Sequence, residues 1–209
     1  MPSRKRYHRN RLRRTRRHLS AARMQRLSRA VCLHAIRLPL YRRASSIGAY
    51  IPIQNEVDCR LLLDHAHRTG KAIFLPVISV DQQLRMVRFR PGDPLRRGPF
   101  GTREPLEGPD RTPARSLPDM ILLPLVGFDR RGVRLGYGGG YYDRLLARFR
   151  GSARRPWRVG LAYGFQAVPS LVPGPRDVPL DGVVTEHGIH RCGYRDSRGA
   201  TFTRMRRGG

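Results

Sequence analysis

Apolar residues along the chain fall into short runs, and the spacing within each run predicts a secondary-structure element. Compact apolar runs typical of buried strands cover residues 46–51, 72–75, 120–126, 159–162 and 182–185, with a weaker alternation at 84–89. Helical spacing covers residues 12–38, loosely, then 58–69 and 141–150. Strands that alternate with helices indicate an α/β fold whose mainly parallel sheet is covered on both faces.

Proline, glycine and serine mark where these elements should begin and end. Ser20 stands where a helix cap is expected, and Gly70 stands just past the end of the second helix. Pro39, Pro52 and Pro76 are expected to stop the element before each of them.

The order of these elements predicts one Rossmann-like domain of three layers over residues 1–189, with a basic helical segment at its start. Residues 91–118 are rich in Pro, Gly and Arg, and we expect a long surface excursion there. Residues 190–209 are polar and basic, which predicts a flexible tail.

Composition excludes several classes of protein and adds one unusual feature, the charge. The 209 residues are 39% apolar, which is enough for a core, and no apolar run is long enough to span a membrane. The net charge is +27, and only Lys5 and Lys71 of the 42 basic residues are lysine. Such a chain attracts polyanions. An Arg-rich genome would give the same surplus with no ligand involved.

The charge leaves a second function open, that of a basic RNA- or ribosome-associated protein. Nonspecific binding of this kind would weaken steeply with salt. No recognised nucleic-acid module appears in the sequence, so no specific nucleic-acid partner is expected. Cys32, Cys59 and Cys192 form no CxxC pair, which favours reduced thiols over disulfides or a zinc site.

Residues 134–143, RLGYGGGYYD, carry the densest candidate chemistry. Four glycines in five positions allow positive φ angles and a close approach of the backbone to a ligand. A helix that starts directly after them would point free N–H groups into the turn, and Arg134 would add a full charge. The segment is either an anion cradle or a tight turn without a ligand.

Three carboxylates are candidates for binding. Asp143, in the first turn of that helix, either complements the helix dipole or binds Mg²⁺ beside phosphates, and Asp181 could supply a second ligand. Glu56 follows the first strand, where α/β sheets bind ligands, and it either caps the next helix or contacts a ligand.

Taken in order, these pieces resemble the 5-formyltetrahydrofolate cyclo-ligase family from about Arg9 to Gly188. The resemblance rests on 134–144, RLGYGGGYYDR, with Tyr50-x-Pro52, Glu56-Val57-Asp58, Glu104-Pro105, Gln166 and 177–181, DVPLD. It implies an enzyme that uses ATP and Mg²⁺ to convert 5-formyltetrahydrofolate to 5,10-methenyltetrahydrofolate, releasing ADP and phosphate. In the family's mechanism the formyl oxygen attacks the γ-phosphate, and N10 then closes the ring.

The resemblance also implies roles for individual residues. The ATP contacts would be Arg9, Arg13, Arg134, Leu135, Gly136, Tyr137, Gly138, Gly139, Gly140, Tyr141 and Tyr142. The folate contacts would be Ile51, Glu56, Tyr137, Gly138, Gly139, Gly140 and Tyr141. The magnesium ligands would be Asp143 and Asp181. Arg9 stands where the family usually has lysine, so a planar fork replaces a point charge.

The acid-free, Arg-rich first 55 residues are similar to a mitochondrial presequence. The family's ATP-contacting segment would begin near Arg9, however, which leaves little room upstream for a cleavable presequence. The resemblance therefore favours a cytoplasmic protein.

Overall fold

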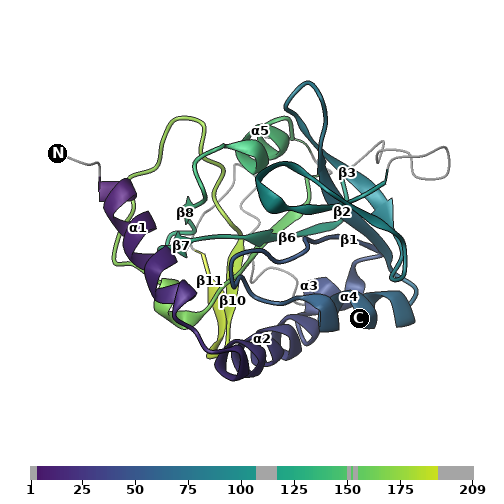
Figure 1. Cartoon of the computed structure of the whole chain (residues 1–209), viewed down its shortest axis with the longest axis horizontal. Helices are drawn as coiled ribbons and strands as arrows, with labels where there is room; N and C mark the ends of the chain where they lie inside the picture. Colours follow the sequence, from purple (N-terminus) through teal and green to yellow (C-terminus); the bar gives the residue numbers. More distant parts are fainter. Residues whose placement is uncertain (1–3, 107–116, 150–151, 153–154, 193–209) are drawn as a thin grey trace.

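A mixed β-sheet forms the centre of the molecule, with helices on both faces (Figure 1). The computed structural model describes residues 4–106, 117–149, 152 and 155–192. The sheet strands are β1 (Ser46–Gly48), β2 (Ala72–Ile78), β3 (Leu84–Phe89), β6 (Met120–Pro124), β9 (Trp157–Leu161), β10 (Gly182–Thr185) and β11 (Gly188–Arg191). They run in the order β11-β10-β9-β6-β1-β2-β3. The inner five are parallel and the outer two antiparallel, which confirms the predicted α/β class.

The helices divide between the two faces of the sheet. In Figure 1, α2 (Ala21–Ile36), α3 (Pro39–Arg43) and α4 (Arg60–Arg68) lie below the sheet, and α5 (Tyr141–Ala147) lies above it. The side chains of β6 alternate between the two layers. Met120 and Leu122 pack toward α2–α4, whereas Ile121 and Leu123 join the cluster of α5. Both faces of β6 are therefore buried, which explains its continuous apolar run.

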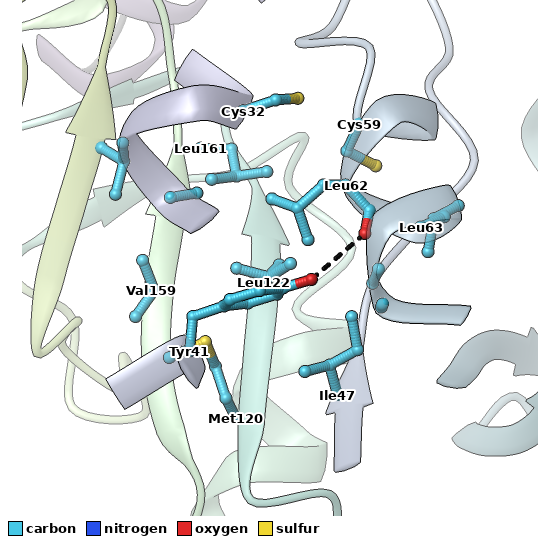
Figure 2. Close-up of a cluster of buried hydrophobic side chains, with 14 of the residues drawn as sticks. Cys32, Tyr41, Ile47, Cys59, Leu62, Leu63, Met120, Leu122, Val159 and Leu161 are labelled. Atoms are coloured by element: carbon cyan, nitrogen blue, oxygen red, sulfur yellow. Dashed lines mark hydrogen bonds between the residues drawn. The ribbon is translucent and has the colours of Figure 1, made fainter. Parts of the chain in front are cut away.

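The larger core cluster lies between the sheet and α2–α4 (Figure 2). Within it the hydroxyl of Tyr41 donates a hydrogen bond to the carbonyl oxygen of Leu62 at 3.4 Å, so a buried phenol keeps a partner. Cys32 and Cys59 lie in the same layer, and both are buried free thiols, as is Cys192. The prediction of unpaired cysteines is confirmed.

The N-terminal region is two helices where the sequence indicated one loose run. The hydroxyl of Ser20 accepts a hydrogen bond from the amide of Arg23 at 3.3 Å and starts α2, which confirms the predicted cap. The preceding helix, α1 (Arg4–Arg17), begins well before the predicted start at residue 12. Its buried positions are His8, Leu12 and Arg16, so polar residues occupy two thirds of its inner face and hide the helical pattern.

Pro76 does not end its strand, contrary to the prediction, and β2 continues to Ile78. The carbonyl oxygen of Phe74 accepts from the amide of Ala49, so the backbone of Phe74 faces β1. Because backbone groups alternate in direction along β2, those of Pro76 and Ile78 point to the same side. Since β1 pairs only as far as Gly48, no partner needs the missing N–H of Pro76. The amide of Ile78 donates instead to Oε1 of Glu104, at 3.4 Å.

Part of the predicted excursion at 91–118 is a hairpin, formed by β4 (Leu95–Arg97) and β5 (Arg103–Pro105), and residues 107–116 lie outside the described residues. A second small hairpin joins β7 (Gly127–Phe128) to β8 (Arg134–Leu135). The boundary of the predicted tail, at residue 190, falls inside β11, and residues 193–209 lie outside the described part. Among the helices that the structure describes, none has the length and apolarity needed to cross a bilayer.

Candidate active site

A cavity of about 490 Å³ opens at the carboxyl ends of β1, β2 and β6. Tyr50 and Ile51 after β1, Ile78 of β2 and Pro124 of β6 contribute to its wall. An α/β sheet binds ligands at this edge. All the residues expected to contact nucleotide or folate line the cavity: Arg9, Arg13, Ile51, Glu56 and 134–142.

The glycine segment 136–140 forms one wall of the cavity between β8 and α5. Gly138 has φ +116° and Gly140 has φ +65°, conformations that only glycine adopts without strain. A Cβ atom at Gly136 or Gly138 would meet nothing within 4 Å, so the segment leaves open space toward a ligand. Tyr141 follows the segment and adds an aromatic ring to the cavity lining, and its ring centroid lies 5.9 Å from that of Phe100.

Helix α1 supplies cations to the cavity beside the glycine segment. Nε of Arg9 donates to the carbonyl oxygen of Gly136 at 2.9 Å, so the helix is tied to the glycine segment through the residue that replaces the family's lysine. Arg13 donates to Oε1 of Gln54 at 3.2 Å and lies 5.5 Å from the ring centroid of Tyr137. Lys5 forms an ion pair of 2.7 Å with Asp177. Three cations of one helix thus face the cavity.

Arg134 and Asp143 form an ion pair at the base of the glycine segment, 2.8 Å between Nη2 and Oδ1. The same oxygen accepts from the amide of Val178 at 3.0 Å. Within the described residues, both hydrogen bonds of this carboxylate go to Oδ1, which leaves Oδ2 on a side chain that is 22% exposed. Nη1 of Arg134 is buried with no hydrogen-bond partner in the described structure. A carboxylate oxygen and a guanidinium N–H group are therefore available beside the cavity.

Asp181, the second predicted magnesium ligand, is held by two arginines. It does not line the cavity, and its carboxylate accepts hydrogen bonds from Arg155 and from three nitrogens of Arg158, at 2.7–3.1 Å. Asp177 lines the cavity instead, with Oδ2 accepting from the amide of Gly174 at 2.8 Å. Burial acts to raise the pKa of Asp177, but the bond from Lys5 and the Gly174 amide outweigh it, so the pKa is lowered.

Replacing Asp181 by asparagine is expected to lower the free energy of unfolding by about 3 kcal/mol. The change removes the negative charge that pairs with Arg158 and Arg155, whose side chains are only 8% and 13% exposed. Urea unfolding measures the loss. The matched variant Asp177→Asn breaks a more exposed pair and should cost less than about 1 kcal/mol. Equal unfolding free energies for the two variants would contradict this structural role of Asp181.

Glu56 is buried in the cavity wall at 4% exposure. Oε2 accepts from the amide of Ile53 at 3.0 Å, and Oε1 accepts from the hydroxyl of Tyr137 at 2.9 Å. Burial raises the pKa of Glu56 above its ordinary value, although the Ile53 amide, the charge of Arg16 and the Tyr137 hydroxyl lower it in part. Glu56 does not cap α4, whose N-cap position is Cys59.

Sequence reasoning missed Lys5 and Asp177, which line the cavity, and Arg16, which is buried on α1 and bonded to Tyr137. Lys5 is one of two lysines, and this rarity was the available signal. Asp177 opens the same five-residue segment that Asp181 closes, and no sequence signal distinguishes the two acids. Arg16 was hidden among the arginines of α1, although its spacing from Leu12 places both on one helix face. Among the described residues, no group of three His, Cys, Asp or Glu could hold a metal ion by itself.

Known proteins are similar to this chain along most of its length. Residues 2–186 match the model of the 5-formyltetrahydrofolate cyclo-ligase family. A 5-formyltetrahydrofolate cyclo-ligase of Haemophilus influenzae is 34% identical over 82% of this chain and 92% of its own length. The enzyme of the same name from Escherichia coli K12 is 31% identical over 83% and 96% of the two chains.

Solved structures are similar as well. The Aquifex aeolicus 5,10-methenyltetrahydrofolate synthetase superposes with a TM-score of 0.77 at 33% identity, covering 97% of this chain and 99% of that one. The synthetase of Mycoplasma pneumoniae shares the fold, with a TM-score of 0.70 at 24% identity over 88% and 99% of the two chains. The match of the family model to residues 2–186, with relatives above 30% identity along most of their length, shows that the chain belongs to the 5-formyltetrahydrofolate cyclo-ligase family.

Proposed function

We propose that the cavity binds ATP and 5-formyltetrahydrofolate and produces 5,10-methenyltetrahydrofolate, ADP and phosphate. The observation that carries the proposal is that the cations of α1, the glycine segment, Asp143 and Glu56 line one cavity. The formyl oxygen would attack the γ-phosphorus while ADP leaves. N10 would then attack the activated carbon, phosphate would leave with the former formyl oxygen, and N10 would lose its proton. Phosphorylation turns a poor leaving group into a good one.

Phosphate binding is assigned to the wall made by α1 and the glycine segment. Arg9 and Arg13 of α1 and Arg134 of β8 all line the cavity. Their positive charges would stabilise the negative charge that spreads over the phosphoryl oxygens during transfer. The remaining nucleotide contacts are proposed for Leu135 and for the backbone of 136–142, where the open space beside Gly136 and Gly138 permits close approach.

Folate binding is assigned to Glu56 and the residues around it. A buried carboxylate that accepts two hydrogen bonds from the described residues has further lone pairs for N–H groups of a pterin. Ile51 would form an apolar wall, and the ring of Tyr141 would offer a face for stacking. With Tyr137 and the glycines 138–140, these residues would hold N10 near the activated carbon, which is the contribution of positioning.

The donor set fits Mg²⁺, which takes one or two carboxylates and completes its shell with phosphate oxygens and water. Oδ2 of Asp143 meets that requirement, and Asp177, on the same cavity wall, is a better second candidate than Asp181. When bound there, Mg²⁺ would neutralise part of the charge on the transferred phosphoryl group. Arg134 holds the Asp143 carboxylate in place for this role.

The test is the cyclisation of 5-formyltetrahydrofolate by the purified chain, followed through the absorbance of 5,10-methenyltetrahydrofolate. Product should appear only when ATP and Mg²⁺ are both present, with one ADP released per ring closed. Product without ATP, or no product in the complete mixture, would overturn the proposed function. Omitting Mg²⁺ in a parallel reaction separates the metal requirement from the nucleotide requirement.

A further inference from the structure

Arg16 is a buried cation that does not line the cavity. Its residue is 2% exposed, on the inner face of α1. Nη1 donates to the carbonyl oxygen of Leu125 at 3.3 Å, and Nη2 donates to the hydroxyl oxygen of Tyr137. The carbonyl oxygen of Arg16 accepts from Nδ2 of Asn55, the neighbour of Glu56, at 3.2 Å. The residue therefore holds both the glycine segment and the loop of Glu56 from behind.

The hydrogen bonds between Arg16, Tyr137 and Glu56 run in one direction. A guanidinium can only donate, so Tyr137 accepts from Arg16 and must use its own proton toward Oε1 of Glu56. Burial, with the charge of Glu56 next, raises the pKa of Tyr137, which keeps the phenol protonated. An ionised Glu56 can only accept, so both of its oxygens keep lone pairs for donors of a ligand.

Resting on the proposed function, we propose that Arg16 is a positioning residue that acts through Tyr137 to keep Glu56 an ionised acceptor for the reduced folate. Because the guanidinium cannot reach the ligand, its effect on binding passes through the phenol and the carboxylate. Reduced-folate binding is then linked to protonation of Glu56, and the α1 helix sets the pH at which binding fails.

Among the described residues, the other titratable groups that interact electrostatically with Glu56 are neutral. Tyr137 faces it from the glycine segment, Tyr142 from α5, and Tyr50 and Cys59 from the segments on either side of the Glu56 loop. Burial raises the pKa of each of these hydroxyl or thiol groups, so none carries a charge near neutral pH. Among the described residues, Arg16 is the cation whose charge lowers the pKa of Glu56.

The experiment measures the affinity for 5-formyltetrahydrofolate by calorimetry without ATP, from pH 5 to pH 8, for wild type and Arg16→Met. A nearby opposite charge changes a carboxyl pKa by about one unit or more, so its loss should move the acid-side midpoint of binding upward by about one unit. At a pH below the midpoints of both proteins, the affinity of Arg16→Met for folate should be about tenfold weaker than that of wild type. The KM for ATP should stay unchanged while the KM for folate rises.

Matched variants separate this role from a general effect on stability. Arg16→Lys keeps a cation, so its midpoint should lie close to that of wild type. Arg17→Met changes an exposed neighbour and should leave the pH profile as in wild type. If Arg16→Met does not fold, Tyr137→Phe interrupts the same series of hydrogen bonds. The acid-side midpoint of folate binding should rise in this variant too. In a double variant the two shifts should not add.

The outcomes distinguish this inference from the proposed function. Wild type that binds reduced folate with an acid-side midpoint but forms no product with Mg-ATP would refute the proposed function and leave the role of Arg16 standing. Identical midpoints for wild type, Arg16→Met and Tyr137→Phe would overturn the inference even in a fully active enzyme. Absence of folate binding by wild type would overturn both.

Discussion

Replacing Glu56 by alanine is expected to lower kcat/KM for 5-formyltetrahydrofolate about a hundredfold or more. A site built around hydrogen bonds to a substrate loses heavily when one partner is removed, since the remaining polar groups are left unpaired. The substitution also leaves the hydroxyl of Tyr137 and the amide of Ile53 without their acceptor. Steady-state kinetics with folate as the varied substrate measure the effect, with ATP held in excess.

Two further variants make the Glu56 result specific. Glu56→Gln keeps the shape but removes the charge, and we expect it to recover only part of the lost activity, because its NH₂ group presents a donor where the substrate also donates. Asp64→Ala removes an exposed acid from α4 and serves as the control with unchanged kinetics. Wild-type kcat/KM in Glu56→Ala would refute the assignment of Glu56 to folate binding.

The strands of the sheet could be predicted because both of its faces are buried. Continuous apolar runs such as 120–126 are favoured only where helices cover each side, and their alternation with helices then implies parallel pairing. The ends were less certain, and β1, predicted over 46–51, ends at Gly48. Pro76 was misjudged because a strand tolerates proline where its neighbour has already ended, which is a property of the pairing and not of the strand itself.

Most of the cavity lining could also be predicted, because the glycine segment and the α1 arginines carry local signals. The acids were harder. Asp177 and Asp181 are four residues apart, and only the tertiary structure shows that two arginines surround Asp181 while Asp177 lines the cavity. Arg16 illustrates a second limit. Its function depends on Tyr137, more than a hundred residues away, and no spacing within α1 reveals that contact.

Replacing Asp143 by asparagine is expected to lower kcat about a thousandfold, the larger of the two effects. The change removes the charge that Arg134 balances and the proposed Mg²⁺ ligand, while the shape of the side chain is retained. Loss of charge stabilisation in phosphoryl transfer commonly costs several kcal/mol, and about 4 kcal/mol corresponds to this factor. Single-turnover kinetics would measure the chemical step itself.

A binding measurement distinguishes loss of the metal from damage to the site. If Asp143 binds Mg²⁺, the increase in ATP affinity that Mg²⁺ gives wild type should vanish in Asp143→Asn, whereas the affinity for ATP measured with a chelator should be little changed. Asp181→Asn is the matched control, because it lies outside the cavity and should keep the Mg²⁺ effect in the fraction that remains folded. Asp177→Asn should weaken the Mg²⁺ effect in the same way as Asp143→Asn. An undiminished Mg²⁺ effect in Asp143→Asn would place the metal elsewhere and overturn the assignment of Asp143.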